Sequence, residues 1–232
     1  MCSSDLLLAG LVCNDSALDR KDGRWDAQGD PTEVALIVAA QKAALDEAAV
    51  KSRLPRIDVI PFESQHQFMA TLHDDADAGR KLVYLKGAVE VVLERCHAAL
   101  DAAGQPAQLD RAGIQAQVTR MASAGLRLLA FARADVPADT QQLRVHNLPG
   151  NFTFIGLQGM IDPPRTEAID AVAACHRAGI QVKMITGDHA GTAAAIGRQL
   201  GLIGGSTPPG RPQALTGQRS EERRVGKECR SR

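Results

Sequence analysis

Thr186, Gly187 and Asp188 stand together where a predicted buried strand ends and a predicted helix begins. Open α/β sheets bind ligands beyond the carboxyl ends of their strands, and the free N–H groups of a helix start attract phosphate. A hydroxyl there can donate to a phosphoryl oxygen, and a carboxylate can accept from a ribose hydroxyl or help organise a magnesium-bound water. A turn with a helix cap would explain the same three residues, so spacing alone leaves both interpretations open.

Four further residues could bind an anionic, aromatic ligand. Lys86 and Gly87 end a predicted strand just before a helix, where lysine can reach an anion and glycine allows close approach. Phe62 could stack on a purine, and Arg127 could make a bidentate contact with phosphate. Each also has a structural explanation: a solvated lysine, a core phenylalanine, or an arginine paired with a carboxylate.

A stiff corner, Asp162, Pro163, Pro164 and Arg165, separates a predicted strand from a predicted helix. Proline fixes φ and disfavours helix at the preceding residue. The segment could serve as a hinge, or simply start a helix with proline.

The elements that must position these residues fall into two groups. In the first, a helix over 31–49, capped by Asp30, precedes short strands, and a later helix ends at Gly125. The expected ranges are strands at 56–62, 68–73, 81–85 and 127–132, and helices at 88–96 and 109–124. The short β-rich segments predict an antiparallel sheet with flanking helices.

After a connector at 135–150, the pattern changes to strand, helix, strand, helix. The expected ranges are 152–160, 166–178, 181–185 and 191–200. This rhythm is typical of a parallel sheet. The pattern therefore predicts the α/β fold class, with an antiparallel sheet and flanking helices followed by a partial parallel α/β domain.

Composition excludes several classes of protein. The 232 residues are 44% hydrophobic and 23% charged, which is ordinary for globular domains. Twenty-seven Lys and Arg balance 27 Asp and Glu, so no net charge favours nucleic acid. The five cysteines lack CxxC spacing, which argues against zinc and a disulfide framework. The longest apolar run, Leu6 to Val12, is too short to span a membrane, so we expect the chain itself to be soluble.

Both ends look foreign to the rest of the chain. Within the last fourteen residues, 219–232 (RSEERRVGKECRSR), the stretch 219–229 resembles a reading frame of a common sequencing adapter, and residues 2–5 can be read from the end of its companion. A solvated basic tail is the alternative. We expect residues 1–5 and 219–232 to be adapter-derived, 6–150 to form one domain and 151–218 part of a second.

Seven short blocks, taken in order, are more specific than any single motif. They are CND at 13–15, GDPTEVAL at 29–36, PFES at 61–64, LKGA at 85–88, GLRLLAFA at 125–132, GMIDPPR at 159–165 and MITGDHAGTAAAIGRQLGL at 184–202. This series resembles the nucleotide-binding domain and part of the phosphorylation domain of type II P-type cation-transporting ATPases, especially calcium-pump-like ones. The resemblance covers essentially Leu6 to Thr216. It implies that the antiparallel sheet is a nucleotide-binding domain and that the second domain is a partial Rossmann-like domain of the haloacid dehalogenase type.

The resemblance implies a role for each matched residue in the first domain. Phe62 would stack on adenine, and Glu33 would approach the adenine end. Lys86, with Gly87 beside it, would line the base and phosphate path. Arg127 would contact the β-phosphate region.

In the second domain, the resemblance implies that Thr186 binds the transferred phosphoryl group and that Asp188 orients the nucleotide. Asp162 to Arg165 would form the interdomain hinge. Two residues depart from the family pattern: Gln67 stands where many relatives carry lysine, and Val89 replaces the proline of KGAP.

Two strings expected of the intact family, DKTGT and GDGxNDxP, do not occur in the sequence. The first carries the phosphorylated aspartate and the second binds magnesium. We therefore expect ATP binding without efficient hydrolysis, and Mg²⁺ ligands mostly outside this chain. The implied parent is a multi-pass membrane enzyme that couples ATP hydrolysis to cation transport, with this region on its cytoplasmic face beside actuator and membrane domains.

Two other functions are alternatives. A soluble phosphatase of the haloacid dehalogenase class would need a DxD pair on a strand, whereas Asp74, Asp75 and Asp77 are expected in a polar loop. A regulatory ATP-binding module is the non-enzymatic alternative.

Overall fold

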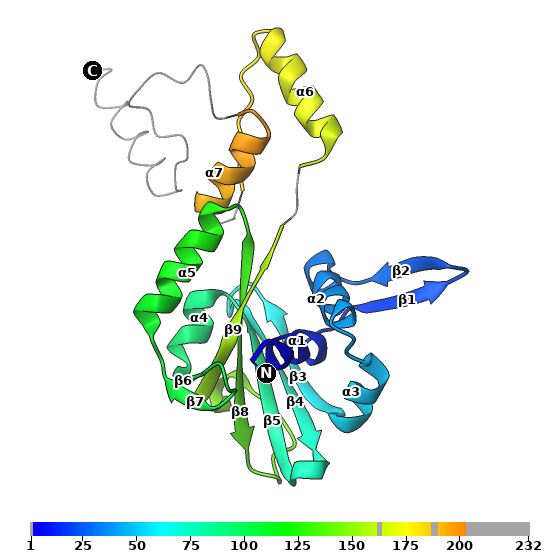
Figure 1. Cartoon of the computed structure of the whole chain (residues 1–232), viewed down its shortest axis with the longest axis vertical. Coiled ribbons are helices and arrows are strands. Elements are labelled where there is room, and N and C mark those ends of the chain that lie inside the picture. The colour runs from blue at the N-terminus through cyan, green and yellow to red at the C-terminus, as the bar shows by residue number, and fades with distance from the viewer. Residues whose placement is uncertain (1, 162–163, 187–189, 203–232) are drawn as a thin grey trace. The chain divides into compact units, whose positions relative to one another are not determined.

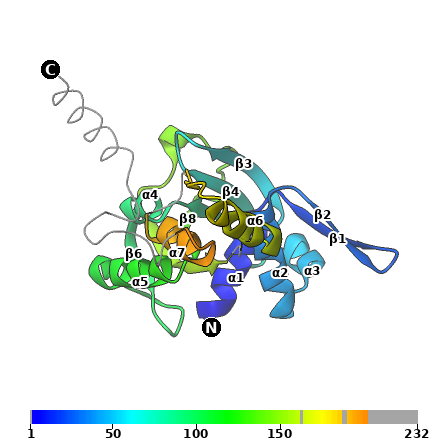
Figure 2. The ribbon, with the colours of Figure 1, turned by 90° about the horizontal axis from the view of Figure 1, so that it is seen from above.

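The computed structural model describes residues 2–161, 164–186 and 190–202. They form two compact units, which are described separately. The first contains residues 1–114 and 128–160, and the second contains 115–127 and the described part of 161–232. Figure 1 and Figure 2 show the ribbon in two views.

The helices are α1 (Cys2–Val12), α2 (Pro31–Lys42), α3 (Glu47–Arg53), α4 (Val89–Glu94), α5 (Arg111–Ser123), α6 (Thr166–Arg177) and α7 (Ala190–Gln199), with short 3-10 helices at Ala76–Ala78 and Val145–Asn147. The strands are β1 (Ala17–Lys21), β2 (Arg24–Gln28), β3 (Arg56–Glu63), β4 (Phe68–Asp75), β5 (Arg80–Gly87), β6 (Cys96–Leu100), β7 (Pro106–Gln108), β8 (Arg127–Val136) and β9 (Phe152–Met160).

Seven strands form one mostly antiparallel sheet in the order β3-β4-β5-β8-β9-β6-β7. The pairs β3–β4, β4–β5, β5–β8 and β6–β7 are antiparallel, and β6–β9 is parallel. The prediction of a mixed α/β chain with an antiparallel sheet and flanking helices is confirmed.

One face of the sheet packs on α1, α2 and α3. Leu11 and Leu36, from two of these helices, join Met69, Tyr84 and Phe131 of the sheet in a core where each side chain is at most 2% exposed. Burial of such side chains is the main stabilising contribution to the unit. On β5, the residues Leu82, Tyr84 and Lys86 alternate toward this face, as strand geometry requires. The last of them brings a charge to the edge of an apolar core.

The predicted helix over 31–49 is wrong in its length, because the structure has two helices there. Asp30 caps α2 as expected, accepting from Thr32 and Glu33 N–H at 2.8 and 3.3 Å. The chain then turns through Ala44, whose φ is +59°, and Asp46 caps α3. A second aspartate cap thus interrupts a continuous apolar pattern.

Residues 152–160 form the expected strand, but β9 lies in the seven-stranded sheet and pairs with β6 rather than opening a separate parallel sheet. The predicted strand over 181–185 is wrong, since residues 181–186 have no regular secondary structure. A strand is stable only when neighbours satisfy its backbone groups. Ile185, expected to be buried, is 97% exposed.

The second unit combines the C-terminal part of α5 with α6 and α7. Gly125 ends α5 with a φ of +83°, which confirms the predicted cap. Thr192 donates to the Leu126 carbonyl at 3.2 Å. A Cβ on Gly125 would lie 3.0 Å from that of Ala195, so α7 packs closely on this turn.

Several strands were missed. The β1–β2 hairpin projects from the sheet (Figure 1) and carries Trp25, which is 61% exposed with Arg20 5.8 Å from its ring centroid. Cys96 was expected to end a helix, but it begins β6. Asp74 and Asp75 end β4 rather than lying in a loop. The strands of the hairpin were not predicted, because their charged residues obscure the alternation of apolar and polar side chains that is typical of a strand.

His73 of β4 is buried beneath the sheet's apolar face. Its Nδ1 lies 2.9 Å from the Leu54 carbonyl, which can only accept, so Nδ1 carries the proton. The ring meets Tyr84 edge-on at 5.6 Å. Burial lowers the pKa of His73 to about 4 from its usual 6.5, with the Arg56 charge acting in the same direction.

Because the pKa of His73 is lower in the folded state, the unfolded chain binds a proton first as pH falls. The contribution of neutral His73 to the free energy of unfolding is therefore fully present above pH 6.5. It is lost as the pH falls toward 4, and the loss amounts to about 3 kcal/mol. Urea unfolding from pH 7.5 to 4 should show this loss in the wild type and a smaller one in His73→Asn, whose amide can still donate to Leu54. Equal pH dependence of the two proteins would contradict the assignment.

Candidate functional site

A buried ion pair stands at the end of β5. Lys86 Nζ lies 2.5 Å from Glu33 Oε1, and their side chains are only 6% and 14% exposed. The lysine comes from the strand and the glutamate from the first turn of α2. Register places Lys86 between Met69 of β4 and Phe131 of β8, so apolar side chains limit its freedom. The structure thus brings together two of the predicted site residues.

The other oxygen of the Glu33 carboxylate is also occupied. Glu33 Oε2 accepts from the Asp15 backbone N–H at 2.9 Å and from the Ser16 hydroxyl at 3.0 Å. The Asn14 amide donates to the Glu33 carbonyl at 2.9 Å. Glu33 is therefore held by the chain at both its side chain and its backbone.

Gly87 follows Lys86 and has no room for a side chain. A Cβ there would lie 2.4 Å from the Gln67 carbonyl oxygen and 2.8 Å from the Phe68 Cα. The same carbonyl accepts from Ala88 N–H at 3.0 Å, and Gln67 itself has a φ of +57°. The glycine is required here by close contact between backbones.

Phe62 is on β3, one strand beyond β4, at the same end of the sheet as Lys86. Ile60 pairs with Ala70 and Glu63 with Phe68, so two residues of β3 face one residue of β4. Such a bulge redirects side chains. Phe62 is 57% exposed, which excludes the core alternative and leaves its ring accessible to a ligand.

The remaining predicted residues belong to the second unit. Arg127 and Thr186 are exposed, Pro164 is half-buried, and Arg165 is the exposed residue that precedes α6. Gly187, Asp188, Asp162 and Pro163 lie outside the described residues. The predicted convergence of Arg127 with the first unit stays a prediction.

Sequence reasoning missed the contribution of Asn14 and Ser16. Ser16 belongs to no motif, and Asn14 is signalled only by the CND block, to which the resemblance gives no role. Its first residue, Cys13, is fully buried, with its Sγ 3.6 Å from the Met69 carbonyl oxygen. Burial raises the pKa of the Cys13 thiol, and the nearby Lys86 charge opposes that shift. The thiol is consequently a core group beside the ion pair. Cys96 and Cys175 are also free.

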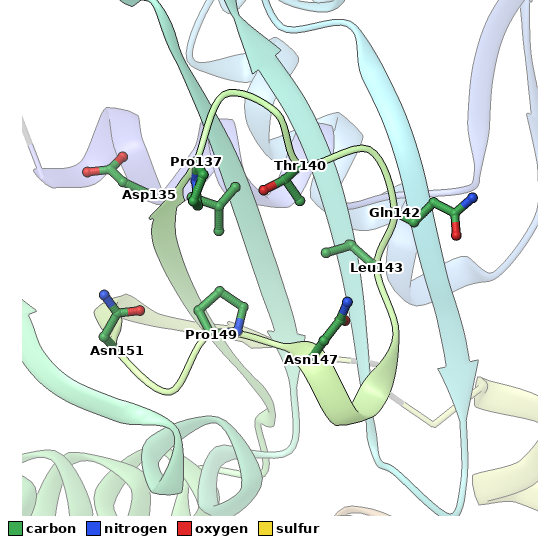
Figure 3. Close-up of a pocket in the computed structure, with 9 residues that line it drawn as sticks. Asp135, Pro137, Thr140, Gln142, Leu143, Asn147, Pro149 and Asn151 are labelled. Carbon is green, nitrogen blue, oxygen red and sulfur yellow. The ribbon is translucent and has the colours of Figure 1, made fainter.

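A surface pocket of about 360 Å³ lies elsewhere, in the loop between β8 and β9 (Figure 3). Pro137, Leu143 and Pro149 line it together with Thr140 and Asn147. β8 reaches this loop at Val136, which pairs with Lys81, at the opposite end of β5 from Lys86. The pocket is therefore separate from the ion pair.

Across 2–161, 164–186 and 190–202, no three His, Cys, Asp or Glu side chains are grouped to hold a metal ion. Within the same ranges, every helix is too short or too polar for a membrane span.

The model of one protein family, "P-type ATPase, cytoplasmic domain N", matches residues 2–167. These residues include the ion pair, Gly87 and Phe62, and they make up more than half of the chain. The chain belongs to this family.

Individual relatives agree with the family match. The chain is 48% identical to "Cation-transporting ATPase pma1" of Synechocystis over 85% of its length and 22% of that relative. It is 46% identical to "Probable cation-transporting ATPase F" of Mycobacterium tuberculosis over 91% of its length and 23% of that relative. A "Calcium-transporting ATPase" of Bacillus subtilis is 34% identical over 85% of this chain and 22% of its own length. The chain therefore spans less than a quarter of the relatives it matches.

Replacing Gly87 with alanine should destabilise the first unit by about 1–3 kcal/mol, because the new methyl group meets the Gln67 and Phe68 backbone. Gly150→Ala is the matched control, since a Cβ at Gly150 meets no atom within 4 Å. Urea denaturation of the three proteins measures the effect. Equal midpoints for Gly87→Ala and wild type would mean that the strand end tolerates a side chain.

Proposed function

We propose that this chain is the ATP-binding part of a P-type pump that couples ATP hydrolysis to cation transport across a membrane. The observation that carries the proposal is the buried Lys86–Glu33 pair, which stands beside a side-chain-free glycine and near an exposed phenylalanine. Membership of the cytoplasmic domain N family supports it. The printed names of the relatives include cation and calcium transport, and we extend cation transport to the whole protein.

ATP suits the residues of the first unit. An exposed ring such as Phe62 can stack on adenine, and Lys86 supplies a positive charge for the path from base to phosphate. Glu33, which is paired with Lys86, would approach the adenine end. Gly87 would lie beside that path, where it lets the backbone come close to Gln67 and Phe68. Arg127 is assigned to the β-phosphate region.

The second unit is proposed as part of a Rossmann-like phosphorylation domain. Thr186 would contact the transferred phosphoryl group, and Asp188 would orient the nucleotide. The chain leaves the first unit after Met160, just before the proposed hinge at Asp162, Pro163, Pro164 and Arg165. Large apolar side chains are exposed in this unit, and a completed domain would bury them. They are Ile161, Ile169, Ile180 and Ile185.

Catalysis is assigned to the whole protein. Mg²⁺ bound with ATP would neutralise charge during phosphoryl transfer, and its protein ligands would come mostly from segments beyond this chain. The transported cation would bind in membrane helices, which together with an actuator domain complete the proposed parent. This region would then face the cytoplasm.

Calorimetric titration of the 232-residue chain with ATP should give saturable binding. Phe62→Ala should weaken it about tenfold by removing the stacking surface. The double variant Glu33→Gln/Lys86→Gln should weaken it by a similar factor or more, because a charge-assisted contact is lost without leaving one buried charge unpaired. Lys42→Gln, an exposed change on α2, is the matched control.

Binding of wild type and of these site variants with one affinity would contradict the proposed site. Incubation with ATP, Mg²⁺ and Ca²⁺ should yield no cation-stimulated phosphate release and no acid-stable acyl-phosphate. Robust turnover by the purified chain would overturn the assignment of catalysis to the whole protein.

A further inference from the structure

The CND block has no role in nucleotide binding as proposed above, yet its turn is built around Glu33. Asn14 lies within the block and Ser16 directly follows it, and both contact Glu33. Lys86 depends on the same glutamate for its buried ion-pair partner. A chain of direct contacts therefore leads from this turn to the Lys86 ammonium group.

Ser16 uses its hydroxyl group twice. Its Oγ lies 3.0 Å from Glu33 Oε2 and accepts from the Asp30 N–H at 3.0 Å. The single hydroxyl proton goes to the carboxylate, since the other acceptor, the Asp30 carbonyl, is 3.4 Å away and uncharged. Ser16 is 7% exposed, so water competes poorly for these bonds. The hydroxyl thus fixes one carboxylate oxygen while the other meets Lys86.

Asn14 fixes the backbone around the same glutamate. Its amide nitrogen donates to the Gly10 and Glu33 carbonyls at 3.1 and 2.9 Å, and its Oδ1 accepts from the Ser16 N–H at 2.8 Å. Both amide protons and the amide oxygen are therefore in use. Asn14 ties the end of α1, the turn and the first turn of α2 together.

Gly29 allows Ser16 to come this close. Its φ is +108°, and a Cβ on it would lie 2.3 Å from the Ser16 hydroxyl oxygen. The GDPTE segment therefore passes close to Ser16 at Gly29, before the segment reaches Glu33.

We propose that Ser16 and Asn14 are positioning residues for nucleotide binding, acting on Lys86 through Glu33. The inference rests on the proposed ATP site, because it gives these residues a role in that site. Without the Ser16 hydroxyl, Glu33 Oε2 keeps only the Asp15 N–H contact. The carboxylate therefore gains rotational freedom, and the Lys86 side chain follows it. ATP then binds a less ordered ammonium group, so affinity falls even while the fold persists.

The test compares Ser16→Ala and Asn14→Asp with Asp46→Ala in the full 232-residue chain. Asp46 caps α3 and accepts from the Ala48 and Ala49 N–H groups, so its loss destabilises the unit at a distance from Glu33. The Lys86 Cε–Hε NMR signal, assigned with Lys86→Arg, reports the order of the ammonium group. Calorimetry with ATP gives affinity at a temperature where thermal unfolding shows every variant to be folded.

We expect the Lys86 signal to move toward the random-coil position in Ser16→Ala and Asn14→Asp, with ATP affinity about fivefold weaker. Asp46→Ala should lower the unfolding temperature and leave both readouts at wild-type values. An unmoved Lys86 signal in Ser16→Ala, or a moved signal with unchanged affinity, overturns the inference, and so does an equal effect of Asp46→Ala. If the wild type binds no ATP, the proposed function and the binding part of this inference both fail. If the wild type binds ATP and the variants bind it equally well, only the positioning role is contradicted.

Discussion

The need to keep one buried positive charge paired governs the architecture around β5. Removing one partner of a buried ion pair costs about 3–5 kcal/mol, since the remaining charge is stranded in an apolar environment. Lys86 is 4% exposed and lies between apolar neighbours, so the Glu33 carboxylate must lie within ion-pair distance of its ammonium group. Three features position the Glu33 carboxylate: the Asp30 cap, the Pro31 start of α2 and the CND turn. The buried charge of Lys86 therefore determines how α2 meets β5, although the two elements are distant in sequence.

Much of the first unit could be predicted from local signals. Asp30 followed by Pro31 marks a helix start in almost any context, and the strands around Phe68 and Val83 are dense in β-forming residues. The break at Ala44 was not predictable from hydrophobic spacing, because the apolar pattern continues through it and only Asp46 signals a second cap. The strand nature of β9 was clear, but its partner was not, since pairing depends on contacts distant in sequence.

In the candidate site, too, local signals could be predicted from the sequence, whereas contacts between residues distant in sequence could not. Lys86, Gly87 and Phe62 could be proposed because their types suit a nucleotide and their blocks occur in family order. The reason for Gly87, a carbonyl oxygen 2.4 Å from the missing Cβ, depends on the strand register and could not be read in advance. Ser16 was overlooked because a serine in a polar turn is ordinary, and only burial beside a carboxylate distinguishes it.

The hairpin that extends from the sheet has a spectroscopic consequence. Trp25 is the single indole of the chain, and it lies mostly in solvent beside Arg20. Indole emission from this protein therefore originates at the hairpin, and it is sensitive to what approaches β1 and β2. A second molecule that covers the hairpin would remove Trp25 from water and so shift the indole emission, whereas events confined to the ion pair at β5 would leave it unchanged.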